Sequence, residues 1–171
     1  MKGNFTDALC THCGLCCDGS LFADVELGSE KEMSGVEAMG LEVEEGDKGE
    51  GLLLQPCSAL KGKRCSIYPY RPNCCRTFEC HLLRKVKSGA VPLEHARSKV
   101  AEVLRQIERI EERIADLHRG DGRRPLKERY LDALAHSAKK PDDKESLRKV
   151  RDLEMMMART EEILEDTFLR G

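Results

Sequence analysis

Nine cysteines occupy the first 80 residues of this 171-residue chain, and no cysteine follows them. The first stretch reads Cys10-Thr11-His12-Cys13-Gly14-Leu15-Cys16-Cys17. Cysteines separated by two residues can turn both sulfurs toward one ion in a tight loop, which is why such pairs recur in zinc and iron–sulfur sites. Gly14 suits the unusual backbone angles of such a loop. The spacing predicts that thiolates bind zinc or iron, with an iron–sulfur cluster among the options.

The second cysteine-rich stretch contains Cys57, Cys65, Cys74, Cys75 and Cys80. Between Lys61 and Lys87 there are eight Lys or Arg residues, and Glu79 is the one acidic residue among them. A metal held by four thiolates is a net anion, and a buried anion needs nearby cations or amide donors. We therefore expect these bases to supply counter-charge to the metal.

The same basic residues raise the alternative of phosphate or RNA binding, as in zinc knuckles. Aromatic side chains on which bases could stack are scarce there, namely Tyr68, Tyr70 and Phe78. The net charge of −2 gives no general reason to expect nucleic acid. We therefore favour the counter-charge role and expect no nucleic-acid partner.

We expect neither export nor membrane insertion of this chain. Residues 1–9 hold one Lys and lack the apolar core of a secretory signal. No stretch approaches the ~20 apolar residues that a membrane-spanning helix needs. We expect a cytoplasmic protein with no membrane contact, and in a reducing compartment clustered cysteines are more often ligands than disulfides. The odd total of nine also prevents complete pairing.

The N-terminal part is predicted to contain short strands and helices. Residues 21–27 resemble a strand, and residues 41–54 resemble a hairpin around a Gly-Asp-Lys-Gly turn. Ser29 followed three residues later by Glu32 has capping-box spacing, which predicts a short helix to about Met39.

A helix is predicted to open at Arg71-Pro72, because proline is tolerated in a first turn. It would carry the last three cysteines toward Lys87 and end at Ser88-Gly89. We therefore place a metal-binding module at residues 1–88 and a helical extension at residues 89–171.

The extension opens with a heptad pattern after Pro92. Apolar residues at the a and d positions are Leu93, Ala96, Val100, Val103, Ile107, Ile110, Ile114 and Leu117. Such a coiled-coil-like seam fits either an internal helical hairpin or a dimer interface. We therefore expect the helices of residues 93–169 to pack on one another, to self-associate or to bind a protein partner.

Two further helices are predicted, at about residues 125–139 and 144–169. Their proposed apolar faces are Leu126, Tyr130, Leu131 and Leu134 in the first, and Val150, Leu153, Met157, Ile163, Leu164 and Phe168 in the second. The run Met155-Met156-Met157 is interpreted as core filler. The predicted fold class is α+β, with a small cysteine-rich module followed by an α-helical hairpin or small bundle.

Residues 8–82 resemble the YkgJ-like cysteine-cluster family, whose common domain is described as zinc- or iron-chelating. The matching features are the Cys10–Cys17 cluster, Pro56-Cys57, and the segment from Cys65-Ser66-Ile67-Tyr68-Pro69 through Arg71-Pro72, Cys75-Arg76 and Phe78 to Cys80. Family members are often labelled iron–sulfur oxidoreductases. The resemblance places one cysteine where Cys75 stands, so Cys74 is additional and is expected not to bind the metal.

The predicted metal ligands are Cys10, Cys13, Cys16, Cys17, Cys57, Cys65, Cys75 and Cys80. Eight thiolates suit one iron–sulfur cluster or two four-coordinate sites. His12 and His81 are expected not to be ligands. Two alternatives remain open, an electron-transfer protein and a structural zinc scaffold that presents its helices to a partner. No catalytic motif stands out, so the sequence does not decide whether the protein is an enzyme.

Overall fold

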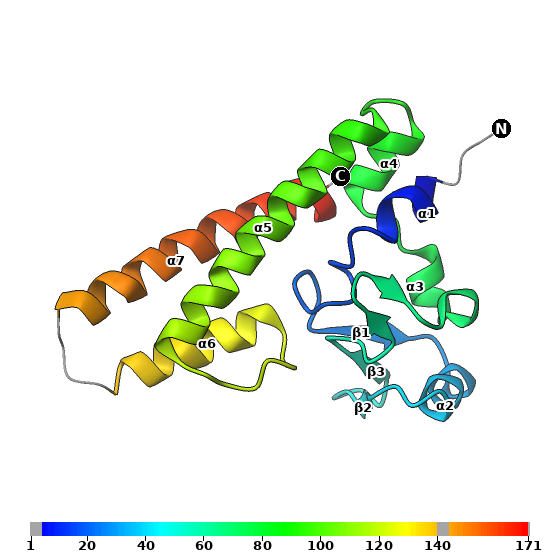
Figure 1. Cartoon of the computed structure of the whole chain (residues 1–171). Coiled ribbons are helices and arrows are strands. Elements are labelled where there is room, and N and C mark those ends of the chain that lie inside the picture. The colour runs from blue at the N-terminus through cyan, green and yellow to red at the C-terminus, as the bar shows by residue number, and fades with distance from the viewer. Residues whose placement is uncertain (1–4, 140–143, 171) are drawn as a thin grey trace. The chain divides into compact units, whose positions relative to one another are not determined.

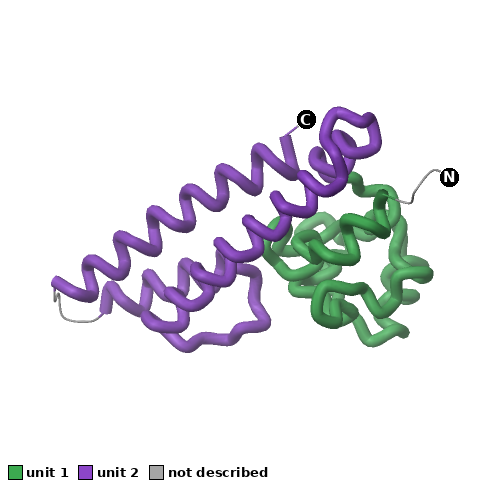
Figure 2. Tube along the Cα trace, turned by 45° about the horizontal axis from the view of Figure 1, so that its top comes forward, with its two compact units in different colours: residues 1–79 green, residues 80–171 purple. Residues whose placement is uncertain are grey.

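The structure is a computed structural model, and it describes residues 5–139 and 144–170. The chain divides into two compact units, Met1–Glu79 and Cys80–Gly171 (Figure 2). The mixed fold class is confirmed, with short antiparallel strands in the first unit and a helical region in the second. The units divide nine residues before the boundary expected from the sequence, so the helix that follows Cys80 groups with the helical part.

The first unit combines short helices with small antiparallel sheets (Figure 1). Its described elements are α1 (Phe5–Cys10), β1 (Asp24–Leu27), α2 (Glu30–Ala38), β2 (Val43–Glu45), β3 (Gly51–Leu54), β4 (Leu60–Lys61), β5 (Arg64–Cys65), η1 (Tyr68–Tyr70) and α3 (Asn73–Thr77). One sheet has the strand order β1-β3-β2, and β4 pairs with β5 in a separate ribbon. The predicted hairpin is confirmed, since Val43 pairs with Leu53 and Glu45 with Gly51.

The N-terminus of α2 is capped as predicted. The N–H of Glu32 donates to Ser29 Oγ at 3.2 Å, and the Glu32 carboxylate accepts the Gly28 N–H at 2.7 Å. The other oxygen of the same carboxylate accepts the N–H of Asn73, the first residue of α3. One side chain thus ties the start of α2 to the start of the helix that carries Cys74 and Cys75.

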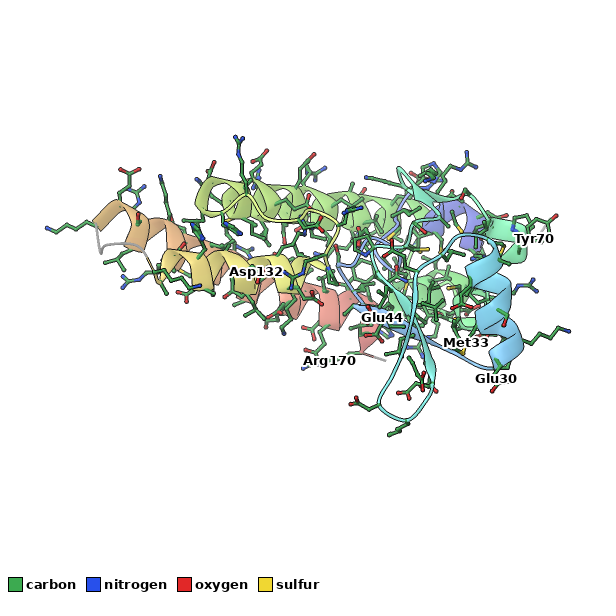
Figure 3. The ribbon with its side chains drawn as sticks, turned by 90° about the horizontal axis from the view of Figure 1, so that it is seen from below. Glu30, Met33, Glu44, Tyr70, Asp132 and Arg170 are labelled. Carbon is green, nitrogen blue, oxygen red and sulfur yellow. The ribbon has the colours of Figure 1, made fainter. Side chains whose placement is uncertain are left out.

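The core of the first unit is small and is lined by sulfur. Its buried members are Leu27, Val36, Leu41, Leu53 and Ala59, and Cys57, Cys65, Cys74 and Cys75 pack against them. Met33, labelled on α2 in Figure 3, also packs on this cluster. Its side chain lies so close to Gly51 that a Cβ at that position would collide with it. A larger residue at Gly51 would therefore require the Met33 side chain to move.

The single helix predicted from Arg71-Pro72 to Lys87 is wrong, because the structure has two helices there. Helix α3 ends at Thr77 and α4 spans His81–Lys87. Phe78 leaves the helical path and packs edge-to-face on Phe22, with ring centroids 5.3 Å apart. Cys80 then begins α4 as its N-cap, its sulfur accepting the Leu83 N–H at 3.4 Å.

The described residues of the second unit form a helical bundle of α4, α5 (Leu93–Leu117), α6 (Leu126–Ser137) and α7 (Lys144–Leu164), followed by a π-helical turn, η2 (Glu165–Leu169). Helix α5 packs on both α6 and α7 (Figure 1). Its buried residues are the predicted a and d residues Ala96, Val100, Val103, Ile107, Ile110 and Ile114. The structure therefore shows the seam of α5 packed against helices of the same chain, which is the first of the two predicted arrangements.

Two predicted core positions of the helices are wrong. Leu131 is 52% exposed, and Ala133 is buried on α6 in its place. At about 100° per residue, Leu131 lies about 140° from the buried Leu126, too far to share one face. Met155 is likewise 59% exposed whereas Met157 is buried, because residues two apart point to opposite sides of a helix.

Candidate metal centre

The first cysteine cluster is a series of tight turns that begins where α1 ends, at Cys10. The N–H of Cys13 donates to the Cys10 carbonyl at 3.2 Å, and the N–H of Cys17 donates to the Gly14 carbonyl at 2.8 Å. Gly14 has a φ of 79°, which a side chain would strain. Its Cα lies over the β4–β5 turn, where an added Cβ would be 3.6 Å from Lys63 Cα. The loop thus rests directly on the second cysteine-rich stretch.

A backbone hydrogen bond joins the two cysteine-rich stretches. The N–H of Cys57 donates to the Cys17 carbonyl at 2.8 Å and also reaches Gln55 Oε1 at 3.1 Å. Gln55 is buried, and its own N–H donates to the Ala23 carbonyl at 3.0 Å. These contacts hold the backbones of Cys17 and Cys57 side by side although 40 residues separate them in sequence.

Cys17 and Cys57 lie within electrostatic reach of each other, of Cys65 and of Cys75. Burial, followed by the charges of Cys57 and Cys65, raises the pKa of Cys17 to about 12. Burial and the charge of Cys65 also raise the pKa of Cys57. The pKa of Cys75 is raised by its hydrogen bond with Cys74, by burial, and by the charges of Cys74, Cys17 and Cys57. Mutual repulsion of this kind arises between neighbouring thiolates.

Positive groups oppose that repulsion. The backbone amides of Ala59 and Leu60 and the charge of Lys61 each lower the pKa of the Cys57 thiol. The guanidinium of Arg71 acts in the same direction on Cys17. Amide donors and a nearby cation are what an anionic metal–thiolate centre needs. Lys61 and Arg71 belong to the basic group noted in the sequence.

The sequence did not predict the contacts that hold the Arg71 side chain in place. Its guanidinium carbon lies 3.5 Å from the centre of the Tyr68 ring, and its Nε donates to the Tyr68 carbonyl at 3.0 Å. The Tyr68 hydroxyl donates to Asp7 Oδ1 at 2.7 Å, which ties this segment to α1. Burial, followed by that hydrogen bond, raises the pKa of Tyr68 to about 12. The Tyr-Pro-Tyr-Arg-Pro segment was the available signal, but it did not reveal Asp7 as the partner.

Cys74 and Cys75 are adjacent on α3, with their sulfur atoms 4.0 Å apart. The hydrogen bond with Cys75 lowers the pKa of Cys74 to about 7, against an opposing effect of burial. The same bond and deeper burial raise the pKa of Cys75. This pair thus loses its first proton readily, because one sulfur stabilises the charge on the other.

The other predicted ligands are Cys10, Cys13, Cys16 and Cys80. Cys10, Cys13 and Cys16 are half-buried on the first loop, and the charge of Cys10 acts on Tyr68. Cys80 is the first residue of the helical unit, where burial raises its pKa and the amides of Leu83 and Leu82 lower it. The ligand roles of these four residues stay predictions.

The nine cysteines, all of them in the described part of the chain, are thiols and form no disulfide. Within residues 5–139 and 144–170, no three Cys, His, Asp or Glu side chains are spaced so that they could hold an ion as they stand. The thiol donor set, its amide donors and its nearby cations nevertheless fit zinc or iron. In the described residues the thiols are therefore not at metal-bonding distances, although the two cysteine-rich stretches lie side by side at Cys17 and Cys57.

Among the described residues, neither of the two histidines next to the cysteines belongs to a group of side chains that could hold a metal ion. His12 Nδ1 lies 3.1 Å from Thr11 Oγ1. The pKa of His81 is lowered by desolvation and by the charges of Lys85 and Arg84. That neither is a ligand stays a prediction.

Comparison with known families decides the class of the protein. The family model "CxxCxxCC: Putative zinc- or iron-chelating domain" matches residues 9–104, which is more than half of the chain. The chain belongs to this family. The match covers both cysteine-rich stretches and extends into α5. No curated protein and no solved structure matches the chain. None of the described helices has the length and apolar character needed to cross a membrane.

Proposed function

We propose that Cys17, Cys57, Cys65 and Cys75 together bind one four-coordinate zinc or iron ion, and that this centre organises the first unit. The family supports metal chelation in general. The observation that carries the finer proposal is that the Cys57 N–H donates to the Cys17 carbonyl, while Cys57, Cys65 and Cys75 pack against one buried cluster. Four thiolates around one ion is a common structural arrangement for both metals.

The proposal assigns each element a role. The Cys57 N–H that donates to the Cys17 carbonyl holds two of the ligand-bearing backbones together. Cys65 lies opposite Leu60 in the β4–β5 ribbon, so the turn of that ribbon returns its sulfur toward Cys57. Cys75 is brought in by α3, whose first N–H is held by Glu32. The bound ion would supply a cross-link among these segments.

Binding is expected to draw the four sulfurs closer together. The amides of Ala59 and Leu60 and the guanidinium of Arg71 would assist this step, since they offset part of the rise in the pKa of Cys57 and Cys17. Raised thiol pKa values mean that protons leave as the ion enters. The proposal includes the cytoplasmic location predicted from the sequence, because a reducing compartment keeps thiols available.

The test is the metal content of the full-length chain purified without oxygen, measured by elemental analysis together with an optical spectrum. Cys17→Ser and Cys65→Ser should each lose one ion per chain relative to the unaltered protein. Ser66→Ala is the matched control, because Ser66 is adjacent to Cys65 and its hydroxyl donates to the Ala59 carbonyl. Unchanged metal content in both cysteine variants would show that the ligand set is wrong.

The same purification separates the two alternatives predicted from the sequence. Iron with stoichiometric sulfide and a reversible reduction potential would favour electron transfer, whereas zinc would favour a structural scaffold. A protein partner for the helices stays a prediction. Since α5 packs its seam on α6 and α7, such a partner would have to use another surface.

A further inference from the structure

Helix α7 carries apolar side chains on a face that the rest of its bundle does not cover. The helix packs beside α5 (Figure 1), and its buried residues are Leu153, Met157, Thr160 and Leu164. On the opposite side, Leu147 is 54% and Met155 is 59% exposed, and Ala158 is exposed as well. At about 100° per residue these three residues lie within about 80° of one another, so they share one face.

Two opposite charges lie on that same face. Arg151 and Glu162 are exposed, and their positions around the helix fall within the range of the three apolar residues. About 16 Å of helix separates them, which is too far for an ion pair within one chain. In the part of the chain that the structure describes, neither has an ion-pair partner, whereas the nearby Arg148 lies 4.0 Å from Asp152. We call the five residues of this face the α7 outer stripe, namely Leu147, Arg151, Met155, Ala158 and Glu162.

The order of charges and sizes along the α7 outer stripe makes it complementary to its own reverse. Arg151 and Glu162 each lie five and a half residues from the centre of the 155–158 run, and Met155 and Ala158 each lie one and a half residues from it. A second copy placed antiparallel, with a two-fold axis at this centre, has its Glu162 opposite Arg151 and its small Ala158 opposite the large Met155. A parallel copy would instead place like charges opposite each other, which costs free energy.

We propose that the occupant of the α7 outer stripe is a second copy of this chain, docked antiparallel, so that the protein forms a symmetric dimer. The two-fold axis makes each ion pair twice, once at either end of the apolar centre. The seam of α5 is buried inside the bundle, so it leaves the exposed face of α7 for this contact. The inference goes beyond the proposed function and does not depend on the metal centre.

Sedimentation of the full-length chain over a range of concentrations tests the dimer. A reducing agent is present throughout, so that disulfides among the nine cysteines cannot link two chains. A reversible equilibrium between monomer and dimer is expected. Arg151→Glu and Glu162→Arg each place two like-charged pairs in the dimer, so each should weaken association at least about tenfold. A chain that stays monomeric at every concentration would overturn the inference.

Mixing the two single variants tests the antiparallel register. In a mixed dimer both ion pairs are restored with their charges exchanged, so Arg151→Glu and Glu162→Arg together should associate although neither does so well alone. No association in the mixture would overturn the register and with it the inference.

Leu131→Glu is the matched control, because Leu131 is 52% exposed but lies on α6. It should leave the equilibrium unchanged, and weakening equal to that of Arg151→Glu would place the interface elsewhere. Far-ultraviolet circular dichroism of each variant confirms that it remains folded, as expected for substitutions at exposed positions.

Discussion

The two compact units bury their interiors by different means. Among the described residues, seven hydrophobic residues are buried before Glu79, whereas fifteen are buried from Leu82 onward. The first unit instead places four half-buried cysteines against its small core. The second unit has a continuous apolar seam along α5, in which Ile110 and Val103 are fully buried.

This difference indicates that the two units are stabilised by different interactions. A helical bundle with a filled seam is stabilised by the hydrophobic effect, at roughly 25 cal/mol per Å² of buried apolar surface. A small unit with few buried hydrophobic residues usually needs disulfides or a metal. Since its cysteines form no disulfide, a metal is the available cross-link for the first unit.

The largest expected effect is that of removing the metal from the full-length chain with a strong chelator under reducing conditions. The first unit should lose on the order of 10 kcal/mol of stability, the size found for structural zinc. Amide hydrogen exchange of the metal-free chain should then show lost protection over residues 24–54 and retained protection over residues 93–117. Equal loss in both segments would contradict the conclusion that the helical unit is stabilised by its hydrophobic seam rather than by the metal.

Acid should weaken metal binding next most strongly. The pKa values of Cys17, Cys57 and Cys75 all lie above the ordinary thiol value of 9.0, so these thiols are protonated at neutral pH and must release protons to bind. Affinity is therefore lost as pH falls, by about 1.4 kcal/mol per thiol and pH unit, or about 4 kcal/mol for three. Chelator competition at pH 8 and pH 7 measures this slope. A pH-independent affinity would argue against thiolate ligands.

Ile110→Ala tests how much the buried seam of α5 stabilises the helical unit. Ile110 is fully buried, so its truncation should cost the helical unit about 2–5 kcal/mol while the metal content stays the same. Urea unfolding followed by far-ultraviolet circular dichroism reports the change. Leu131→Ala is the control, because Leu131 is 52% exposed and its loss should have little effect. Loss of metal in the Ile110→Ala variant would show that metal binding depends on the stability of the helical unit.

The smallest effect should come from the ion pair between α6 and α7. Lys127 Nζ lies 3.0 Å from Glu161 Oε1, and the Lys127 side chain is 68% exposed. Exposed pairs of this kind contribute about 0.2–1 kcal/mol. Lys127→Met should therefore change the unfolding midpoint far less than Ile110→Ala does. A comparable change would mean that charge, rather than the seam, stabilises the bundle.

Much of the fold follows from local sequence signals. The capping box at Ser29, the hairpin between Val43 and Leu54, and the heptads of α5 each depend on neighbouring residues, which is why they were predictable. The break between α3 and α4 was missed, because it depends on Phe78 packing against Phe22, a residue 56 positions earlier. The exposure of Leu131 was missed for a different reason, because Leu131 lies about 140° around the helix from the buried Leu126 and the prediction placed both on one face.

The sequence by itself determined the chemistry of this protein, since the types and spacing of its cysteines predicted metal binding and the family. The tertiary structure decided which cysteine-bearing segments lie side by side, because long-range contacts join them. The Cys57 N–H that reaches the Cys17 carbonyl, and the Glu32 carboxylate that holds the helix bearing Cys74 and Cys75, join segments about 40 residues apart. The type of each side chain can be seen in the sequence, whereas residues distant in sequence come close only when the chain folds.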